Sequence, residues 1–175
     1  MTLKELFTTY FSQVTLLLLS IGYIVGTIVN YRSKKLEINH SLFQQNKILA
    51  VSNFMSNYAK TELMWSHIAI YEILSNNLKA KEIDGIIWPP LNEMKKSVLE
   101  LKIYFNGEDH IAFEKILDGF LSVNEELSNL YSSSNKELEL IHKSNKFHSF
   151  KETALKQNED LLTKVCEEIR RIYKS

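Results

Sequence analysis

Apolar residues dominate the first thirty positions of the chain, and a mixed pattern of apolar and polar positions follows. No charged residue occurs between Leu6 and Tyr31, and the densest apolar run extends from Val14 to Val29. About 20 helical residues cross a hydrocarbon layer of about 30 Å. The uncharged stretch is long enough for this crossing, so the pattern predicts a transmembrane anchor with its basic flank over residues 1–35.

Two other interpretations of this stretch are a cleaved secretion signal and a buried core helix. A secretion signal has a positive start and a small-residue cleavage site, whereas here Lys4 is balanced by Glu5 and no such site follows. A core helix of a soluble protein rarely extends this far without a charge. The sequence therefore favours a permanent single-pass anchor whose first partner is the lipid bilayer.

The charges beside the anchor predict its orientation. Arg32, Lys34 and Lys35 follow the apolar run, and only Lys4 precedes it. Because positive flanks stay on the cytoplasmic side, we expect the N-terminus outside and the C-terminal part in the cytoplasm. The lone cysteine, Cys166, is compatible with a reducing compartment. We expect localisation at the inner (cytoplasmic) membrane of a bacterium.

The remainder of the chain is predicted to be helical. The sequence contains only 5 glycines and 2 prolines, and such scarcity of turn formers favours a few long helices. Apolar spacing predicts helices over about 36–77, 90–105, 109–131 and 136–173, the first continuing from the anchor without a glycine or proline between them. We expect Gly85 and Pro89-Pro90 to break the helical pattern before residue 90, and Asp109 to cap the third helix.

Helix lengths suggest how these elements pack. Short connections favour an antiparallel up-down bundle over residues 36–175. At helical rise the first and last helices would be about 63 Å and about 57 Å long, and the middle two only about 25 Å and about 35 Å. We therefore expect an all-α fold in which the two long helices form a membrane-proximal stalk.

Two patterns suggest self-association into a homo-oligomer. Gly22 and Gly26 form a GxxxG motif, which allows close helix contact in membranes; simple lipid exposure is the alternative. In the stalk, Asn and Leu alternate at heptad-like spacing, and Asn in such a seam fixes register at a cost in stability. We hypothesise an oligomer seam there, with solvent-facing asparagines as the alternative. The seam consists of Asn39, Leu42, Asn46, Leu49 and Asn53.

Two groups of basic residues, one just after the apolar stretch and one near the C-terminus, suggest contact with the membrane surface. If the last helix returns to the bilayer, both groups would face anionic headgroups. Compensation of the negative end of the last helix is the alternative for the C-terminal group. The residues are Arg32, Lys34 and Lys35, together with Arg170, Arg171 and Lys174.

No pattern in the sequence predicts catalysis, a metal or a cofactor. Glu37–His40 and Glu139–His142 have the spacing of di-iron ligands, but helical rise would place them about 50 Å apart. Cys166 lies beside two glutamates, which disfavour a reactive thiolate. The 21 basic and 21 acidic residues balance, which argues against nucleic acid as a partner. We expect a protein that is not an enzyme.

Aromatic and basic clusters have both ordinary and functional interpretations. The aromatics expected in the distal bundle indicate either a ligand pocket or a core, and the core is favoured. They are Tyr58, Trp65, Tyr71, Trp88, Tyr104 and Phe105. The acid-free segment 142–151 offers either a phosphate-binding surface or a solvated helix face with Phe147 and Phe150 in the core, and the latter is favoured.

The function that these features favour is a membrane-anchored interaction or sensor module. It would dock a cytosolic protein partner, or act as an accessory subunit of a membrane complex, in bacterial signalling or defence. The alternative is a membrane-perturbing effector that acts through oligomerisation of the transmembrane helix. The GxxxG motif and the Asn and Leu seam are the only support for this alternative.

Overall fold

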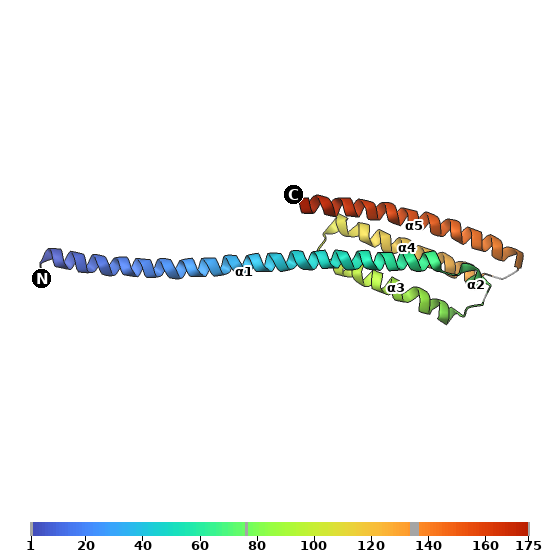
Figure 1. The fold of residues 1–175 in the computed structure, drawn as a ribbon, viewed down its shortest axis with the longest axis horizontal. Helices are drawn as coiled ribbons and strands as arrows, with labels where there is room; N and C mark the ends of the chain where they lie inside the picture. Colours follow the sequence, from blue (N-terminus) through green and yellow to red (C-terminus); the bar gives the residue numbers. More distant parts are fainter. Residues whose placement is uncertain (1, 76, 134–136, 175) are drawn as a thin grey trace. The chain divides into compact units, whose positions relative to one another are not determined.

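The computed structural model describes residues 2–75, 77–133 and 137–174, and this part of the chain is almost entirely helical. It contains five helices and no strand, as expected for an all-α fold with one long apolar N-terminal helix. The helices are α1 (Leu3–His67), α2 (Ile70–Leu74), α3 (Ala80–Leu101), α4 (Gly107–Ser132) and α5 (Glu137–Lys174) (Figure 1). The chain divides into two units, Met1–Asn46 and Lys47–Ser175, here called the anchor unit and the head.

Helix α1 contributes to both units and ends earlier than the sequence pattern indicates. The helix expected over residues 36–77 is continuous with the apolar stretch, but it stops at His67. The backbone of Ala69 is not helical (φ −80°, ψ 75°). Ile73 and Leu74 in the short helix α2 are almost fully buried. We attribute the early end to this burial, which outweighs the local preference for continued helix.

The expected break at the prolines does not occur, and this expectation was wrong. Helix α3 runs from Ala80 to Leu101 and contains Gly85, Pro89 and Pro90 in its interior. An interior proline costs about 3 kcal/mol, whereas burying one large apolar side chain contributes about 1.5–3 kcal/mol. The stripe that crosses the prolines supplies four such side chains, so burial outweighs the loss. They are Ile83, Ile87, Leu91 and Met94.

Helix α4 begins two residues before the expected start. Asn106, rather than Asp109, occupies the N-cap position with an extended backbone, and its side chain makes no capping hydrogen bond. Gly107 follows with φ +37°, a conformation that favours glycine because a side chain would be strained there. The turn before α4 is therefore set by the Asn106-Gly107 pair.

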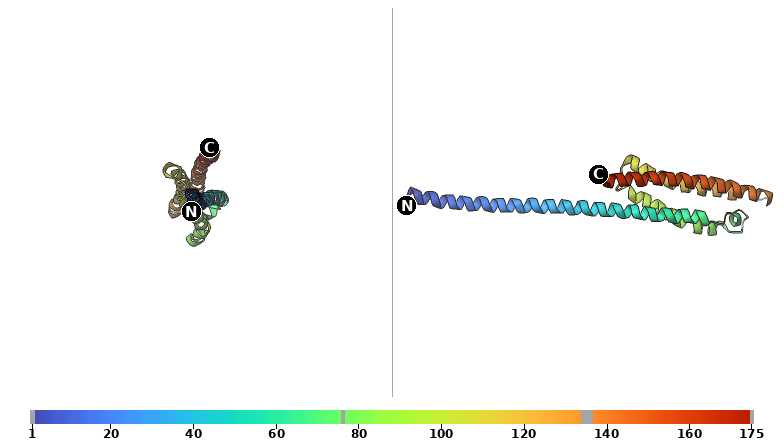
Figure 2. Two further views of the ribbon diagram at one scale, coloured as in Figure 1. Left: turned by 90° about the vertical axis from the view of Figure 1, so that its left-hand side faces the viewer. Right: turned by 45° about the horizontal axis from the view of Figure 1, so that its top comes forward.

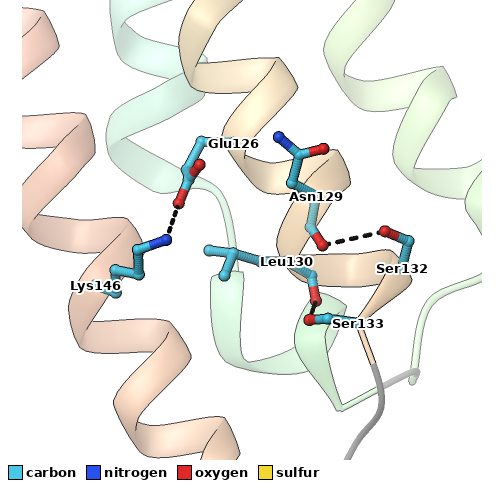
Figure 3. A network of polar contacts seen from close by, with 6 residues as sticks. All are labelled: Glu126, Asn129, Leu130, Ser132, Ser133 and Lys146. Atoms are coloured by element: carbon cyan, nitrogen blue, oxygen red, sulfur yellow. Dashed lines mark hydrogen bonds and ion pairs between the residues drawn. The ribbon is translucent and has the colours of Figure 1, made fainter.

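At the other end of α4, two serine hydroxyls bind the last turn of the helix. Ser132 Oγ donates to the carbonyl oxygen of Asn129 (3.1 Å), and Ser133 Oγ donates to that of Leu130 (2.7 Å) (Figure 3). The last carbonyls of a helix have no partner within the helix. These hydroxyls supply donors for two of them, consistent with a helix end near the expected residue 131.

Aromatic side chains of α1 form the centre of the head's core. Phe54 packs edge-on against Phe113 of α4, with ring centroids 4.9 Å apart, and Tyr58 packs against Phe120 at 5.3 Å. Trp65 is fully buried, with its ring centroid 6.4 Å from that of Phe147 in α5. Both views in Figure 2 and the view in Figure 1 show the head segment of α1 beside α3, α4 and α5.

Helices α4 and α5 approach each other closely at Gly119. A Cβ atom at this position would lie 2.2 Å from Oδ1 of Asn158. Asn158 is 2% exposed, and its Nδ2 donates to the carbonyl oxygen of Ile116 (3.0 Å). Nearer the end of α4, Lys146 Nζ lies 2.8 Å from Glu126 Oε1 and joins the same two helices (Figure 3). The close approach of the two helices therefore depends on a glycine.

We expect Gly119→Ala to destabilise the head by about 1–3 kcal/mol, because the added methyl group overlaps the Asn158 amide. Gly85→Ala is the matched control, since a Cβ there meets nothing within 4 Å and alanine favours helix by about 0.5–1 kcal/mol. Thermal unfolding of the full chain in mild detergent measures both. Adding Asn158→Ala to Gly119→Ala should restore part of the loss, and an unchanged midpoint for Gly119→Ala would contradict the packing.

Candidate functional site

The apolar stretch of α1 is uncovered by the rest of the described chain. No residue of its most apolar 18-residue window is buried, and Leu16 and Leu19 are 65% and 66% exposed. By length and composition, this is the one helix in the described part that could cross a membrane. The expected anchor therefore corresponds to a single continuous helix.

Hydroxyl side chains within this stretch are satisfied inside the helix. The hydroxyl oxygens of Thr15, Ser20 and Thr27 each donate to the carbonyl four residues earlier, at 2.8 Å. In hydrocarbon an unpaired polar group costs several kcal/mol, because no water can replace the missing partner. These three residues are thus compatible with lipid surroundings despite their polarity.

The two self-association motifs lie on different faces of α1. A Cβ at Gly22 or Gly26 would meet nothing within 4 Å, and Asn39, Leu42 and Asn46 are exposed. At about 100° per residue, the glycine pair and these three residues are centred roughly 150° apart around the helix. The GxxxG motif and the Asn and Leu seam therefore cannot form one continuous contact surface. Whether either associates stays a prediction.

The other two seam residues belong to the head. Leu49 is 57% exposed, and Asn53 is exposed beside a polar groove between α1 and α3. The groove has a volume of about 270 Å³ and also contains Lys60 and Glu93. Asn57, beside it, donates from Nδ2 to Ser97 Oγ at 2.7 Å. Asn53 thus has a polar environment within its own chain.

The basic residues expected at the membrane surface occur in both units. Arg32, Lys34 and Lys35 are exposed in the anchor unit. In the head, Arg170 is exposed, and the exposed Arg171 forms an ion pair with Glu168. The side chain of Lys174 lies outside the described part. A shared contact with headgroups stays a prediction.

A groove with an apolar floor and a charged rim lies between the start of α4 and the end of α5. We call it the α4–α5 groove; its volume is about 390 Å³. The floor consists of Phe105, Ala112, Phe113, Val165 and Ile169. The rim consists of Glu108, Asp109, Lys164, Glu168 and Arg171. No sequence pattern predicts this groove, because its two sides are more than fifty residues apart.

The rim of the α4–α5 groove has an uneven charge distribution. Arg171 is engaged by Glu168. Glu108 and Asp109 lie in the first turn of α4, where the helix dipole favours negative charge. Neither makes a side-chain hydrogen bond or ion pair with another residue in the described ranges. The α4 side of the groove therefore offers two carboxylates beside an apolar floor.

The expected aromatic core is only partly formed. Tyr58, Trp65 and Phe105 are buried, whereas Tyr71 is 54% exposed. Trp88 is 41% exposed, donates from Nε1 to Asp84 Oδ1 at 3.0 Å, and lines a smaller cavity of about 150 Å³. The indole of Trp88 thus forms a cavity wall at the surface.

In the basic segment 142–151, only one of the two phenylalanines is in the core. Phe147 is fully buried as expected, but Phe150 is 39% exposed, so that part of the expectation was wrong. Lys151, the residue after Phe150, is buried instead, although the segment was expected to present its basic residues to solvent. Its apolar stem allows a lysine to occupy a core-facing position when its amine finds a carbonyl.

Lys151 of α5 binds the end of α1. Its side chain is buried, and Nζ donates to the carbonyl oxygen of Trp65 at 3.1 Å, in the last turn of α1. Burial lowers the pKa of the Lys151 amine below its ordinary value, and the nearby Glu152 carboxylate partly opposes this effect. The amine therefore serves as a structural cap for a helix end.

The two Glu-x-x-His pairs, for which the sequence predicts no shared metal, belong to different units of the chain. Among residues 2–75, 77–133 and 137–174, no group of three or more His, Cys, Asp or Glu side chains could hold a metal ion. Glu37 and His40 belong to the anchor unit, and Glu139 and His142 to the head. Cys166 is half-buried.

No family model matches the chain, and comparisons with curated proteins and with solved structures found no match. The candidate sites are therefore interpreted from their own chemistry. Two features carry functional weight, namely the uncovered apolar helix and the α4–α5 groove.

We expect the Lys151 amine to make the stability of the head increase with pH. Between its lowered pKa and the ordinary value of 10.5, the unfolded chain binds more protons than the folded chain, so stability rises with pH in this window. Burial also raises the pKa of Tyr58, whose effect above pH 10 has the opposite sign. Denaturant unfolding from pH 7 to 10 gives the free energy of unfolding of the wild type and of Lys151→Met. Because both proteins contain Tyr58, its contribution cancels in the difference between them. A stability difference that does not change with pH would contradict the assignment.

We expect charges within the apolar stretch to prevent stable membrane insertion. The variant carries both Leu18→Arg and Ile24→Arg. Each arginine should make the free energy of membrane insertion less favourable by about 2.5–3.5 kcal/mol near the centre of a bilayer. Leu99→Arg, at a head position that is 59% exposed, is the matched control. Alkaline carbonate extraction measures the fraction of chain left in the membrane pellet. Recovery of the wild-type chain in the aqueous fraction would contradict the anchor.

Proposed function

We propose that this chain is a single-pass membrane protein that docks a cytosolic protein partner and has no enzymatic activity. Its N-terminus lies outside a bacterial inner membrane, and its head lies in the cytoplasm. The observation that carries the proposal is the uncovered apolar helix, because lipid is the solvent that stabilises such a surface. Arg32, Lys34 and Lys35 after this stretch support the orientation.

The head serves in this proposal as a rigid antiparallel up-down bundle. Its support is the aromatic core and the close α4–α5 contact at Gly119, where Asn158 fills the space next to the glycine. A packed scaffold of this kind holds surface side chains in fixed positions, which lowers the entropy lost on binding. The head is thus suited to presenting a docking surface.

We place the docking surface at the α4–α5 groove. The floor is apolar, and the carboxylates of Glu108 and Asp109 border it. Its volume of about 390 Å³ lies at the low end of the range of about 300–1,000 Å³ found for small-molecule pockets, which is enough room for one large side chain of a partner. On the α4 side of the rim, opposite Lys164 and Arg171, charge complementarity favours a partner segment that inserts a large apolar side chain and carries Lys or Arg beside it. An amphipathic helix has this arrangement.

We expect Ala112→Trp to abolish docking, because the indole fills the groove above Phe113. Ala59→Trp, at an exposed position of α1, is the matched control for adding an aromatic surface group. Full chain in native membranes is chemically crosslinked, and recovery of the crosslinked partner is measured for each variant. Equal recovery with Ala112→Trp and the wild type would contradict docking at this groove.

The same crosslinking experiment also tests the negative charge on the α4 side of the groove. Glu108→Gln with Asp109→Asn should weaken partner recovery, whereas Glu125→Gln on the exposed surface of α4 should leave it unchanged. Neutralisation keeps the shape of both side chains, so a loss reports charge rather than packing. The thermal midpoint of each variant shows that the head remains folded.

A further inference from the structure

The anchor unit carries a continuous apolar stripe along α1. The stripe begins at Phe7 and proceeds by alternate steps of three and four residues to Gln45. Large apolar side chains occupy every position except Lys35 and Gln45, and all positions are exposed. This spacing averages 3.5 residues, the period of a seam in a left-handed coiled coil. We call these positions the anchor stripe.

Polar and small residues of the apolar stretch lie off the anchor stripe. Thr15, Ser20 and Thr27 fall between its positions, as do Gly22 and Gly26. Where lipid surrounds the helix, the large apolar side chains of the stripe are already in an apolar solvent and need no protein partner. The part beyond the basic residues is different, because water is the solvent there.

Ile38 and Leu42 continue the anchor stripe past Arg32, Lys34 and Lys35. They are 58% and 51% exposed. An aliphatic side chain left in water forgoes the stabilisation that burial would give it, and a lone helix in water has little stability of its own. A partner that extends from the membrane into the cytoplasm would cover both side chains and stabilise this segment.

We propose that a second copy of this chain packs along the anchor stripe as a parallel, in-register, left-handed two-stranded coiled coil. The inference rests on the membrane anchor of the proposed function. The occupant must be a transmembrane helix with the same spacing on both sides of the headgroup region. A second copy meets this requirement, and insertion in the same orientation makes the pair parallel.

The two polar positions of the anchor stripe fit this occupant. A single Lys or Asn at a core position of a coiled coil fixes register and favours a defined number of strands. In register, Gln45 faces Gln45 of the partner copy, where amide donors and acceptors match. Lys35 faces Lys35 of the second copy in the same way, and the long stems let the two amines diverge toward the headgroups. A shifted register would set these polar groups against Ile38 or Leu42.

The charges beside the anchor stripe permit this pairing. Asn39 and Asn46 flank the stripe, facing Lys34 and Ser41 of the second copy at the positions that set partner choice. Neither of these two flanking pairs brings like charges together, so the like-charged contact of the stripe is the one between the two Lys35 residues. Leu42 occupies the seam, and the asparagines border it. The glycine pair is centred roughly 150° from the anchor stripe, so a GxxxG dimer would use another face.

Site-specific crosslinking in native membranes tests the register. In a Cys166→Ser background, single cysteines replace Leu42 on the anchor stripe, Leu36 off the stripe, or Gly26 in the GxxxG motif. Leu36 is the matched control because it is an exposed leucine (69%) on the same helix, about 120° from Leu42. With a short bismaleimide, Leu42→Cys should give at least about fivefold more dimer than Leu36→Cys.

Equal crosslinking at Leu42 and Leu36, no dimer at Leu42, or a dominant dimer at Gly26 would each overturn the proposal. Sedimentation of the full chain in density-matched detergent provides a second measurement. Leu42→Asn should weaken dimerisation by about tenfold, the equivalent of about 1.4 kcal/mol, and Leu36→Asn should not. Equal dissociation constants for these two variants would also overturn it.

Carbonate extraction of the same membranes separates the two proposals. If the chain stays in the membrane pellet but Leu42→Cys gives no dimer, the coiled coil is refuted and the anchor stands. If the chain appears in the aqueous fraction, the anchor itself is refuted. The location of the chain therefore identifies which proposal has failed.

Discussion

A helix whose apolar side chains have no cover from their own chain has to be solvated by lipid or by another protein. This requirement applies to the first half of α1, where the apolar side chains point in every direction. The hydroxyls of Thr15, Ser20 and Thr27 are already bonded to the helix backbone, so lipid imposes no additional penalty on them. Our proposals for the anchor, the orientation and the parallel pairing all follow from the solvent of this one segment.

In the head, the same helix has a one-sided character. Phe54, Tyr58 and Trp65 point into the core, and the exposed positions carry polar residues together with Ile48, Leu49 and Leu63. A change from apolar on all sides to apolar on one side is the difference between a helix in lipid and a helix on the surface of a domain. Helix α1 thus passes from one pattern to the other without a break in its backbone.

Buried polar side chains in the head serve the ends of other helices. Lys151 of α5 donates to the last turn of α1. His110 of α4 forms a hydrogen bond through Nε2 with the carbonyl oxygen of Val98 near the end of α3 (2.9 Å), and its Nδ1 lies 3.2 Å from Glu114 Oε1. Carbonyls at helix ends lack partners within their own helix, so these contacts fix one helix end against another. They contribute specificity to a core that apolar packing alone would leave less defined.

Much of the secondary structure could be predicted from the sequence, because long helices leave a strong periodic pattern. The continuity of α1 and of α5 follows from the scarcity of glycine and proline. The path of α3 through Pro89 and Pro90 could not be predicted, because local preference opposes it and burial of Ile83 and Leu91 decides it. The α4–α5 groove was also inaccessible to sequence reasoning, since its floor combines residues from distant segments.

The two tryptophans occupy contrasting environments within the head. Trp65 is fully enclosed near Phe147, whereas Trp88 is partly in water and bonded to Asp84. An indole in apolar surroundings emits at shorter wavelength than one in contact with water. The intrinsic emission of the protein consequently combines two components, and an aqueous quencher reaches the Trp88 component while the Trp65 component stays shielded for as long as the core is intact.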